Sequence, residues 1–383
     1  MYQFSAPMPY TIEDIKKLLD INKHVEKSKI TSLFFSLPST NELFTGFEQK
    51  RNIFFHKTNW EYWKKLIIYC LNSGVDIIYL LNSPKGISIE NPELEQQLEK
   101  LDKLLNELRK QGVNKLRIAN HNLLSYLNKH YNDFNLYAST SFELKTLCEY
   151  KNFMFVHPYV KQIIPAHDCI RNIKLLKNIK KSLFDTDIEL MVNEGCINGC
   201  PLRTNHASNY LDKNILYRND NTLSSFYDSE FFCGRYAEKN LFHTLIKSNN
   251  IFPWDIETYA KAGIKKFKLV GRDSLKKNIE TYLKSYFYYL KGIDNIKEIE
   301  NISVNTFIYH LSDNTALKKL TVKDIYKYLP KIKHFDKYGE YCSYQCGIDC
   351  LYCYKCAEKI QKIYEKKMNK IAKSRIYIPA CKI

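Results

Sequence analysis

The sequence lacks the segments and motifs that identify several common classes of protein. No apolar run approaches the ~18–20 residues that a membrane span needs, and no signal peptide precedes the first expected strand. There is no G-x-S-x-G, no H-E-x-x-H and no P-loop, so no nucleophile–base pair of a known hydrolase can be named. We therefore expect a cytoplasmic protein without a membrane span, and the missing motifs count against hydrolysis by a familiar mechanism.

The composition indicates a globular enzyme-sized chain. Its 383 residues are 45% hydrophobic and 26% charged, which fits a single α/β barrel with an appendage. The net charge of +17 suggests a polyanionic partner such as RNA. The alternative is a compositional bias, because lysine, asparagine, isoleucine and tyrosine are all abundant and the lysines are spread along helical faces.

Short apolar runs alternate with amphipathic segments, which predicts parallel β/α units. Eight such runs predict a TIM-type (β/α)8 barrel, whose chemistry sits at the carboxyl ends of the strands. A ninth run, Phe153–Val156, is an alternative for the sixth strand. The eight expected strands are Tyr2–Ala6, Ser32–Leu37, Asp76–Leu81, Lys115–Ala119, Asn135–Ser139, Val160–Ile164, Ile188–Val192 and Phe267–Val270.

The barrel pattern predicts two parts of the chain. Residues 1–292 form the barrel, with a long polar and aromatic insertion at 201–250 after the seventh strand. Residues 293–383 form a lysine-rich extension that carries a cluster of cysteines. Elsewhere, Cys70, Cys148 and Cys381 look structural, since a buried helical cysteine is usually a small hydrophobe.

One stretch, Ile188–Arg203, gathers most of the reactive side chains. Glu194 and Cys196 come directly after the seventh expected strand, and Cys200 follows at a C-x3-C spacing. Thiolates are soft ligands that bind zinc, copper(I) or iron–sulfur clusters, so these two cysteines and Cys233 form three ligands of a predicted metal site. Candidates for the fourth ligand are Cys169, His206 and the C-terminal cysteines.

Other motifs resemble a known family. The segment AKAGIKKFKLVGR at Ala260–Arg272 resembles the "aGi-x-x-x-K-I-E-G-R" signature of the peptidase U32 family, and Tyr137–Phe142 resembles its "ST" strand end. The cysteine-bearing strand IELMVNEGCINGC stands where that family has its seventh strand. Two departures mark a divergent member: Val270 replaces the usual glutamate, and Asn-Glu-Gly replaces the His-Gly-Ala before Cys196.

The resemblance implies one of two activities. The family name implies proteolysis of a collagenase-like kind. Several members instead resemble oxygen-independent hydroxylases that act on RNA bases or ubiquinone precursors and carry a four-cysteine [4Fe–4S] cluster. In this context the resemblance favours an iron–sulfur cluster over structural thiols at Cys196, Cys200 and Cys233.

The C-terminal extension contains a second group of five cysteines within fifteen residues. Its C-x2-C-x2-C run resembles the bacterial ferredoxin pattern without the final Cys-Pro. A zinc site can use similar spacings and is the alternative. With the first three thiols, the five would supply eight ligands for two [4Fe–4S] clusters. These five predicted ligands are Cys342, Cys346, Cys350, Cys353 and Cys356.

Several polar side chains at the expected barrel mouth suit catalysis or binding. Glu194 could act as a general acid or base, with a pKa raised by burial, or could instead hold the cysteine loop. Arginine and lysine side chains suit a carboxylate or phosphate substrate, although internal salt bridges explain them equally well. His243 is expected on the surface. The predicted catalytic residues are Glu194, His206 and Arg272, and the predicted substrate-binding residues are Asn193, Arg203, Arg235 and Lys268.

Three hypotheses for function stay open at the level of sequence. The leading one is a U32-like iron–sulfur enzyme with one or two clusters that oxidises or hydroxylates a small molecule, a peptide or an RNA base. The second is a U32-type peptidase. The third is a non-catalytic RNA-binding subunit or a heteromeric partner subunit. The first hypothesis is also compatible with a U32-like partner protein or an electron donor.

Overall fold

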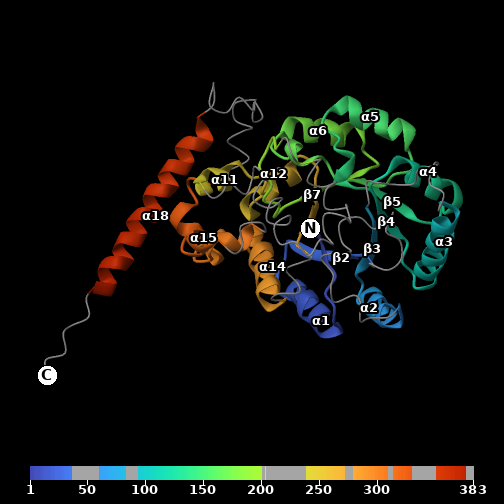
Figure 1. Cartoon of the computed structure of the whole chain (residues 1–383), viewed down its shortest axis with the longest axis horizontal. Coiled ribbons are helices and arrows are strands. Elements are labelled where there is room, and N and C mark those ends of the chain that lie inside the picture. The colour runs from blue at the N-terminus through green and yellow to red at the C-terminus, as the bar shows by residue number, and fades with distance from the viewer. Residues whose placement is uncertain are drawn as a thin grey trace, which may run out of the picture.

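Eight parallel strands close into a barrel in chain order, with β8 pairing back onto β1 (Figure 1). This architecture confirms the predicted (β/α)8 barrel. The computed structural model describes residues 1–36, 60–82, 94–200, 203, 239–271, 279–308, 314–329 and 351–376. The strands are β1 (Tyr2–Pro7), β2 (Ser28–Phe35), β3 (Asp76–Leu81), β4 (Lys115–Ile118), β5 (Asn135–Ala138), β6 (Gln162–Ile163), β7 (Asp187–Met191) and β8 (Lys266–Lys268).

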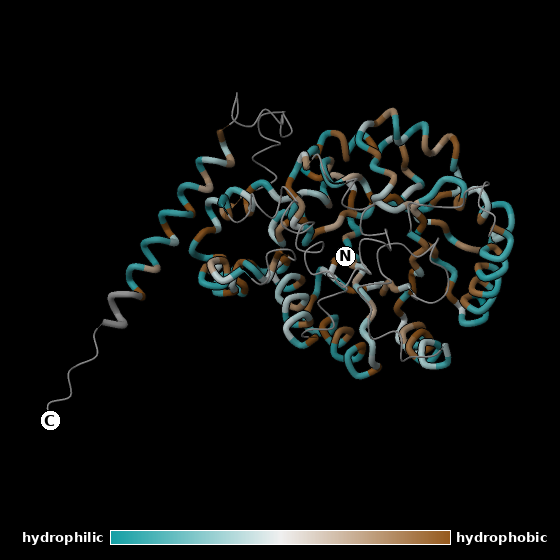
Figure 2. The backbone as a smooth tube through the Cα atoms, in the orientation of Figure 1, coloured by the Kyte–Doolittle hydropathy of each residue, from teal (hydrophilic) through white to brown (hydrophobic). Residues whose placement is uncertain are grey.

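A ring of helices surrounds the barrel (Figure 1), and hydrophobic and hydrophilic residues alternate along these helices (Figure 2). In α3 (Leu94–Lys110) the buried leucines recur at helical spacing, as their sequence pattern predicts: Leu101, Leu104, Leu105 and Leu108. The other helices of the ring are α1 (Ile12–Asp20), α2 (Trp60–Asn72), α4 (His121–His130), α5 (Leu147–Val156), α6 (Ile173–Ser182), α12 (Ile256–Lys261) and α14 (Ile279–Asp294).

The apolar run Phe153–Val156 is the last turn of α5, so the alternative that made it a strand is wrong. Phe155 and Val156 are 86% and 61% exposed. The run is therefore only partly buried, since Phe153 is 4% exposed, and hydrophobicity alone does not report burial. The strand that fills this place in the barrel is Gln162–Ile163, within the expected range.

The residues after α14 pack onto the barrel helices. Phe307 contacts Tyr289 of α14, and Tyr326 contacts Trp254, with ring centroids 5.8 and 4.9 Å apart. The expected domain boundary after residue 292 falls in the last turn of α14, and the division itself stays a prediction. In the described part of the chain no helix is long and apolar enough to cross a membrane. The remaining helices are α11 (Leu241–Lys247), α15 (Thr315–Lys318), α16 (Val322–Ile325) and α18 (Tyr352–Ile376).

The interior of the barrel is partly apolar and partly charged. Phe34, Ile78, Leu80 and Tyr137 form a small apolar cluster that is separate from the main core between strands and helices. Beside this cluster lies Arg117 of β4, which is only 1% exposed. An interior with a buried guanidinium needs compensating groups, because an isolated charge in an apolar environment is very costly.

Polar side chains of other strands accept hydrogen bonds from Arg117 and compensate its buried charge. Its Nη1 donates to Glu189 Oε2 and its Nη2 to Gln162 Oε1, each at 2.5 Å. Ser5 Oγ donates to Glu189 Oε1 at 2.8 Å. Burial opposes ionisation of Glu189, but Arg117 and Lys268 outweigh it and hold the pKa of this carboxyl below its ordinary value. The network joins β1, β4, β6 and β7 through the barrel interior.

We predict that breaking this buried pair destabilises the protein strongly. Glu189→Gln and Arg117→Met each leave one charge buried without its partner, which costs about 3–5 kcal/mol. The double variant Glu189→Gln/Arg117→Met removes both charges and should cost clearly less than the sum of the two. Urea unfolding of the four proteins measures this coupling.

The exposed pair Arg109–Asp133 provides the matched control. Arg109 Nε lies 2.6 Å from Asp133 Oδ2, and both side chains are more than 40% exposed. Arg109→Met should cost less than about 1 kcal/mol. Equal losses for the buried and the exposed pair would contradict a structural role for the interior network.

Candidate functional site

The predicted cysteine site lies on the loop that follows β7, at the carboxyl end of the barrel. The side chains of Cys196 and Cys200 are half-buried. Glu194 is 9% exposed, and its Oε1 accepts a hydrogen bond from the backbone N–H of Cys196 at 3.3 Å. Glu194 therefore helps to hold the cysteine loop, which is one of the two roles that the sequence suggested for it.

On one side, backbone hydrogen bonds fasten this loop to the end of α11. Ile197 and Ser248 form an antiparallel bridge. Asn198 N–H donates to the Lys247 carbonyl at 3.0 Å, and Asn249 N–H donates to the Cys196 carbonyl at 2.8 Å. The backbone that carries Cys196 is thus paired in the manner of a short β-ladder.

Arg171 fixes the end of α11 from the barrel side. This side chain is 4% exposed, and its Nη2 donates to the carbonyls of Ile246 and Ser248 at 2.5 and 2.6 Å. A cation at the carboxyl end of a helix satisfies carbonyls that have no partner within the helix and complements its dipole. Arg171 thereby holds the segment to which the cysteine loop is bonded.

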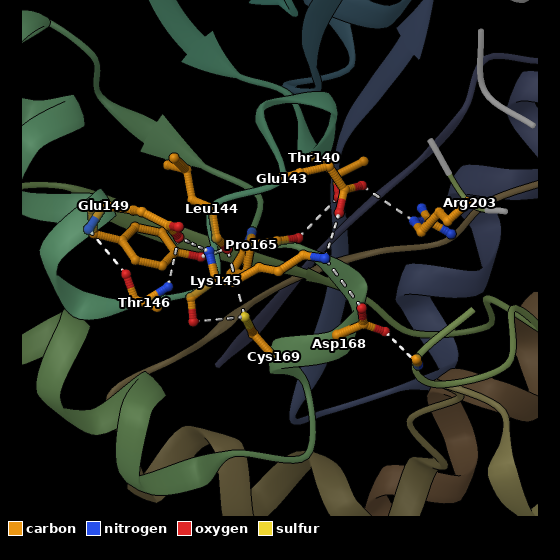
Figure 3. Close-up of polar contacts among 12 residues, drawn as sticks. Thr140, Glu143, Leu144, Lys145, Thr146, Glu149, Pro165, Asp168, Cys169 and Arg203 are labelled. Carbon is orange, nitrogen blue, oxygen red and sulfur yellow. Dashed lines mark hydrogen bonds and ion pairs between the residues drawn. The ribbon is translucent and has the colours of Figure 1, made fainter. Parts of the chain in front are cut away.

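On the other side, the loops after β5 and β6 contact the cysteine loop (Figure 3). Asp168 Oδ1 accepts from the Gly199 N–H at 2.9 Å, and Gly199 has a φ of +70°, which glycine adopts without steric cost. Lys145 Nζ lies 3.5 Å from Asp168 and 3.9 Å from Glu143. Glu143 itself has a φ of +50°, which is uncommon for a residue with a Cβ.

Arg203 completes the charged group around the thiols. Its Nε donates to Glu143 Oε1 at 3.3 Å (Figure 3). Burial disfavours the guanidinium charge, but Cys196, Glu194 and Glu143 outweigh this effect and raise the pKa of Arg203. The site therefore places a permanent positive charge near Cys196 and Glu194.

Asn193, predicted to bind substrate, joins the ends of β7 and β8. Its Nδ2 donates to the Val270 carbonyl at 3.0 Å, and its Oδ1 accepts from the Val270 N–H at 2.7 Å. The Asn193 side chain thus makes the two hydrogen bonds that the backbone of a neighbouring strand would make. It extends the pairing of β7 with β8 past the last residues of the two strands. A substrate contact by Asn193 stays a prediction.

Lys268, also predicted to bind substrate, is the last residue of β8 and lies inside the barrel. Its Nζ is 4.2 Å from the centroid of the Phe34 ring. Burial and then repulsion by Arg117 lower the pKa of this amine to about 7, against the attraction of Glu189. Near pH 7 a large fraction of Lys268 is therefore neutral, a state in which the amine can accept a proton.

Two of the C-terminal cysteines, Cys353 and Cys356, lie buried in the first turns of α18. This helix packs against α11, where Tyr354 stacks on His243 with centroids 4.0 Å apart. His243 is 4% exposed, so its predicted surface position is wrong. Because the end of α11 is also hydrogen-bonded to the cysteine loop, this short helix contacts both cysteine-bearing segments.

The remaining described cysteines differ in their surroundings. Cys169 is buried, and its thiol donates to the carbonyls of Leu144 and Lys145 at 3.6 and 3.5 Å (Figure 3). Burial raises its pKa to about 12, which disfavours a thiolate ligand. Cys70 is buried in α2, as expected of a structural cysteine, whereas Cys148 is exposed on α5.

Seven predicted site residues lie outside the described residues, so their expected roles stay predictions. They are His206, Cys233, Arg235, Arg272, Cys342, Cys346 and Cys350.

The sequence analysis did not predict the roles of the charged residues inside the barrel or of the residues that hold the cysteine loop in place. Glu189 and Arg117 each stand between two apolar residues of their strand, and a charge at a buried position of a parallel strand is a signal that could have been used. Asp168 and Arg171 follow β6 in ordinary loop sequence. Their roles depend on which backbone lies opposite, and no local pattern reports this.

Comparison with known proteins finds a relative along nearly the whole chain. No family model matches the chain. It is 22% identical over 386 residues to an uncharacterized protease of Methanocaldococcus jannaschii, covering 95% of this chain and 99% of the relative. The likeness spans nearly the whole length of both chains.

Solved structures resemble the chain more distantly. A U32 peptidase shares 11% identity and a TM-score of 0.40, covering 58% of this chain and 83% of that one. A dihydrodipicolinate synthase from Bacteroides thetaiotaomicron shares 8% identity and a TM-score of 0.35, covering 95% and 98%. Likenesses at this level carry nothing about substrate or chemistry.

We predict that Lys268→Met stabilises the protein at pH 7. A lysine whose folded pKa is about 7 must lose a proton on folding that the unfolded chain keeps up to about pH 10.4. The wild type is therefore penalised most at and below pH 7, and its stability rises as the pH increases from about 7 to 10. Methionine removes the penalty at similar volume, with an expected gain of about 2 kcal/mol after loss of the Phe34 contact.

Urea unfolding at pH 7 and pH 10 measures the free energy of unfolding of the variant and the wild type. The difference between these two free energies should be smaller at pH 10. Lys266→Met is the control, because Lys266 lies two positions earlier on the same strand, is 31% exposed and pairs with Asp187 at 2.6 Å. Destabilisation by Lys268→Met at pH 7 would mean that the folded protein holds this amine charged.

Proposed function

We propose that this chain is a U32-like enzyme that holds an iron–sulfur cluster on Cys196, Cys200 and Cys233 and modifies its substrate by a redox reaction or an oxygen-independent hydroxylation. The substrate is a small molecule, a peptide or an RNA base bound at the carboxyl end of the barrel. The observation that carries the proposal is the cysteine loop after β7, which is fastened on both sides and has Arg203 beside it.

The described donors suit such a cluster. Cys196 and Cys200 are half-buried cysteines on one loop, and soft sulfur ligands select iron–sulfur clusters or zinc. The positive charge of Arg203 near Cys196 stabilises a thiolate. When bound, a cluster supplies electron transfer or an iron site open to substrate. Cys233 lies outside the described residues, and the fourth ligand stays open.

The surrounding residues of this chain would orient the substrate and move protons. Arg203 is suited to a carboxylate or phosphate, because its guanidinium presents several donors in a fixed plane. Glu194 offers a carboxyl group next to the cysteine loop. Lys268, with its amine pKa of about 7, is suited to accept a proton within the barrel.

Cys353 and Cys356 support a second cluster or a zinc site in the extension. Both thiols are buried at the start of α18, which packs on α11. A second cluster at this place would lie across α11 from the first cysteine group, which suits delivery of electrons. One of these thiols could alternatively complete the first site.

A peptidase is the second candidate. The observation in its favour is the name of the M. jannaschii relative, which is described as an uncharacterized protease. Release of peptides from a protein substrate by metal-free or chelated protein would favour it.

We expect anaerobically purified protein to contain iron and acid-labile sulfide in equal amounts. About four irons per chain would indicate one [4Fe–4S] cluster and about eight would indicate two. Cys196→Ser should lower the iron content by about one cluster and remove the corresponding signal in electron paramagnetic resonance after reduction. Cys356→Ser should affect a different signal if the extension holds its own cluster.

Cys148→Ser is the matched control, since Cys148 is an exposed cysteine on α5 and is not one of the predicted ligands. It should keep all the iron. Zinc without iron in the wild type would contradict the redox proposal and leave the peptidase as the leading candidate.

A further inference from the structure

Five lysines form one stripe along α18. Their spacing of four, three, four and four residues matches the helical repeat, so they share one face of the helix. At 1.5 Å per residue the stripe is about 22 Å long, with steps of about 4.5–6 Å between neighbours. All five side chains are exposed: Lys355, Lys359, Lys362, Lys366 and Lys370.

The opposite face of α18 is fixed to the body of the protein. Ile360 is fully buried, and the ring of Tyr364 lies 5.6 Å from that of Phe242 on α11. Lys367 Nζ pairs with Asp324 Oδ2 of α16 at 2.5 Å. These contacts orient the helix so that the lysine stripe is exposed to solvent, although Lys359 also contacts the body of the protein, with its Nζ 5.7 Å from the centroid of the Tyr328 ring. Figure 1 shows α18 at the edge of the molecule beyond α11, and in Figure 2 hydrophilic colour prevails along it.

The charge of this stripe is not neutralised within the helix. Between Tyr352 and Lys370 there are six lysines and two glutamates. Within the described residues, the ion pair of α18 is the one made by Lys367. The helices α1 and α14 each pair a lysine with a glutamate one turn away, as with Lys17–Glu13 and Lys284–Glu280. The row of five lysines on α18 is also longer than the lysine face of α6, which has three exposed lysines.

We propose that the lysine stripe of α18 binds the phosphate backbone of an A-form RNA stem. A row of regularly spaced cations is complementary to a row of phosphates, and their contact releases counterions. The stripe itself contains no aromatic side chain, and the amines of Lys327 and Lys359 lie over the neighbouring Tyr328 ring. The stripe is therefore suited to contact the backbone and not to read sequence. Phosphates along one strand lie closer together in A-form than in B-form duplexes, which suits the short steps of the stripe.

An anionic membrane is the other partner that a basic helix could meet. Such binding requires the apolar face of the helix to enter the lipid. In α18 that face is covered, because Cys356, Ala357 and Ile360 are buried against the protein. RNA needs only the exposed lysines and leaves the packing of α18 intact.

This surface goes beyond the proposed redox function and does not depend on it. The stripe begins beside Cys356, so a stem bound along α18 would extend from the C-terminal cysteine group toward the free end of the helix. Loss of RNA binding with unchanged iron, or loss of iron with unchanged RNA binding, would separate the two proposals.

The test measures binding of a fluorescently labelled RNA stem–loop to the full chain by anisotropy, between about 50 and 200 mM salt. The variant Lys362→Gln/Lys366→Gln/Lys370→Gln neutralises the outer part of the stripe, away from the cysteines. We expect the affinity to fall at least about tenfold, and the slope of log K against log salt to decrease in magnitude by about 2–3. Iron content and thermal unfolding should stay those of the wild type.

The matched control neutralises three exposed lysines on one face of α6, as Lys174→Gln/Lys177→Gln/Lys181→Gln. It changes the net charge equally and should keep the affinity within about twofold of the wild type. An equal loss in both variants would overturn the proposal, because net charge would then explain binding. A DNA hairpin that binds as tightly as the RNA would overturn the assignment to RNA. Binding to anionic vesicles that depends on the stripe, without RNA binding, would replace RNA by a membrane surface.

Discussion

The ion pair between Arg117 and Glu189 is the constraint on which the barrel and its site depend. Both groups are almost fully buried, so each charge is tolerable only because the other lies within hydrogen-bond distance. Ser5 and Gln162 satisfy further donors and acceptors of the pair. The pair fixes β4 relative to β7, and the loop with the cysteines begins a few residues after Glu189. Arg117 also helps to lower the pKa of Lys268, because it disfavours a second positive charge in the barrel interior.

The cysteine loop is held by parts of the chain that are distant in sequence. Asp168 reaches it from the loop after β6, and the segment after α11 pairs with it on the other side. Asn193 adds a bond from β7 to β8. A loop with so many fixed points keeps its thiols in one place, and such preorganisation is what a metal site or a catalytic group requires.

The strands could be predicted because apolar runs alternate regularly with amphipathic segments over the whole barrel. The same signal made Phe153–Val156 an alternative for the sixth strand, because an apolar run does not show whether its residues are buried. Phe155 and Val156 are in fact exposed. Cys196, Cys200 and Glu194 could be found at a strand end by residue type. The contacts of Arg117 and Asp168 could not, because a single sequence does not show which side chains meet across a barrel or which loops lie together. The burial of His243 depends in the same way on α18, which comes more than a hundred residues later.

The short helix α11 has a consequence for local motion. Its end is bonded to the cysteine loop through Asn198 and Asn249, while its side packs on the start of α18. The amide hydrogens of Asn198 and Asn249 can exchange with solvent only when the loop and α11 separate. Because α18 rests on the same helix, an opening that releases the first cysteine group also disturbs the support of the second. The two groups therefore belong to one cooperative unit of local unfolding, and the protection of these two amides reports on both.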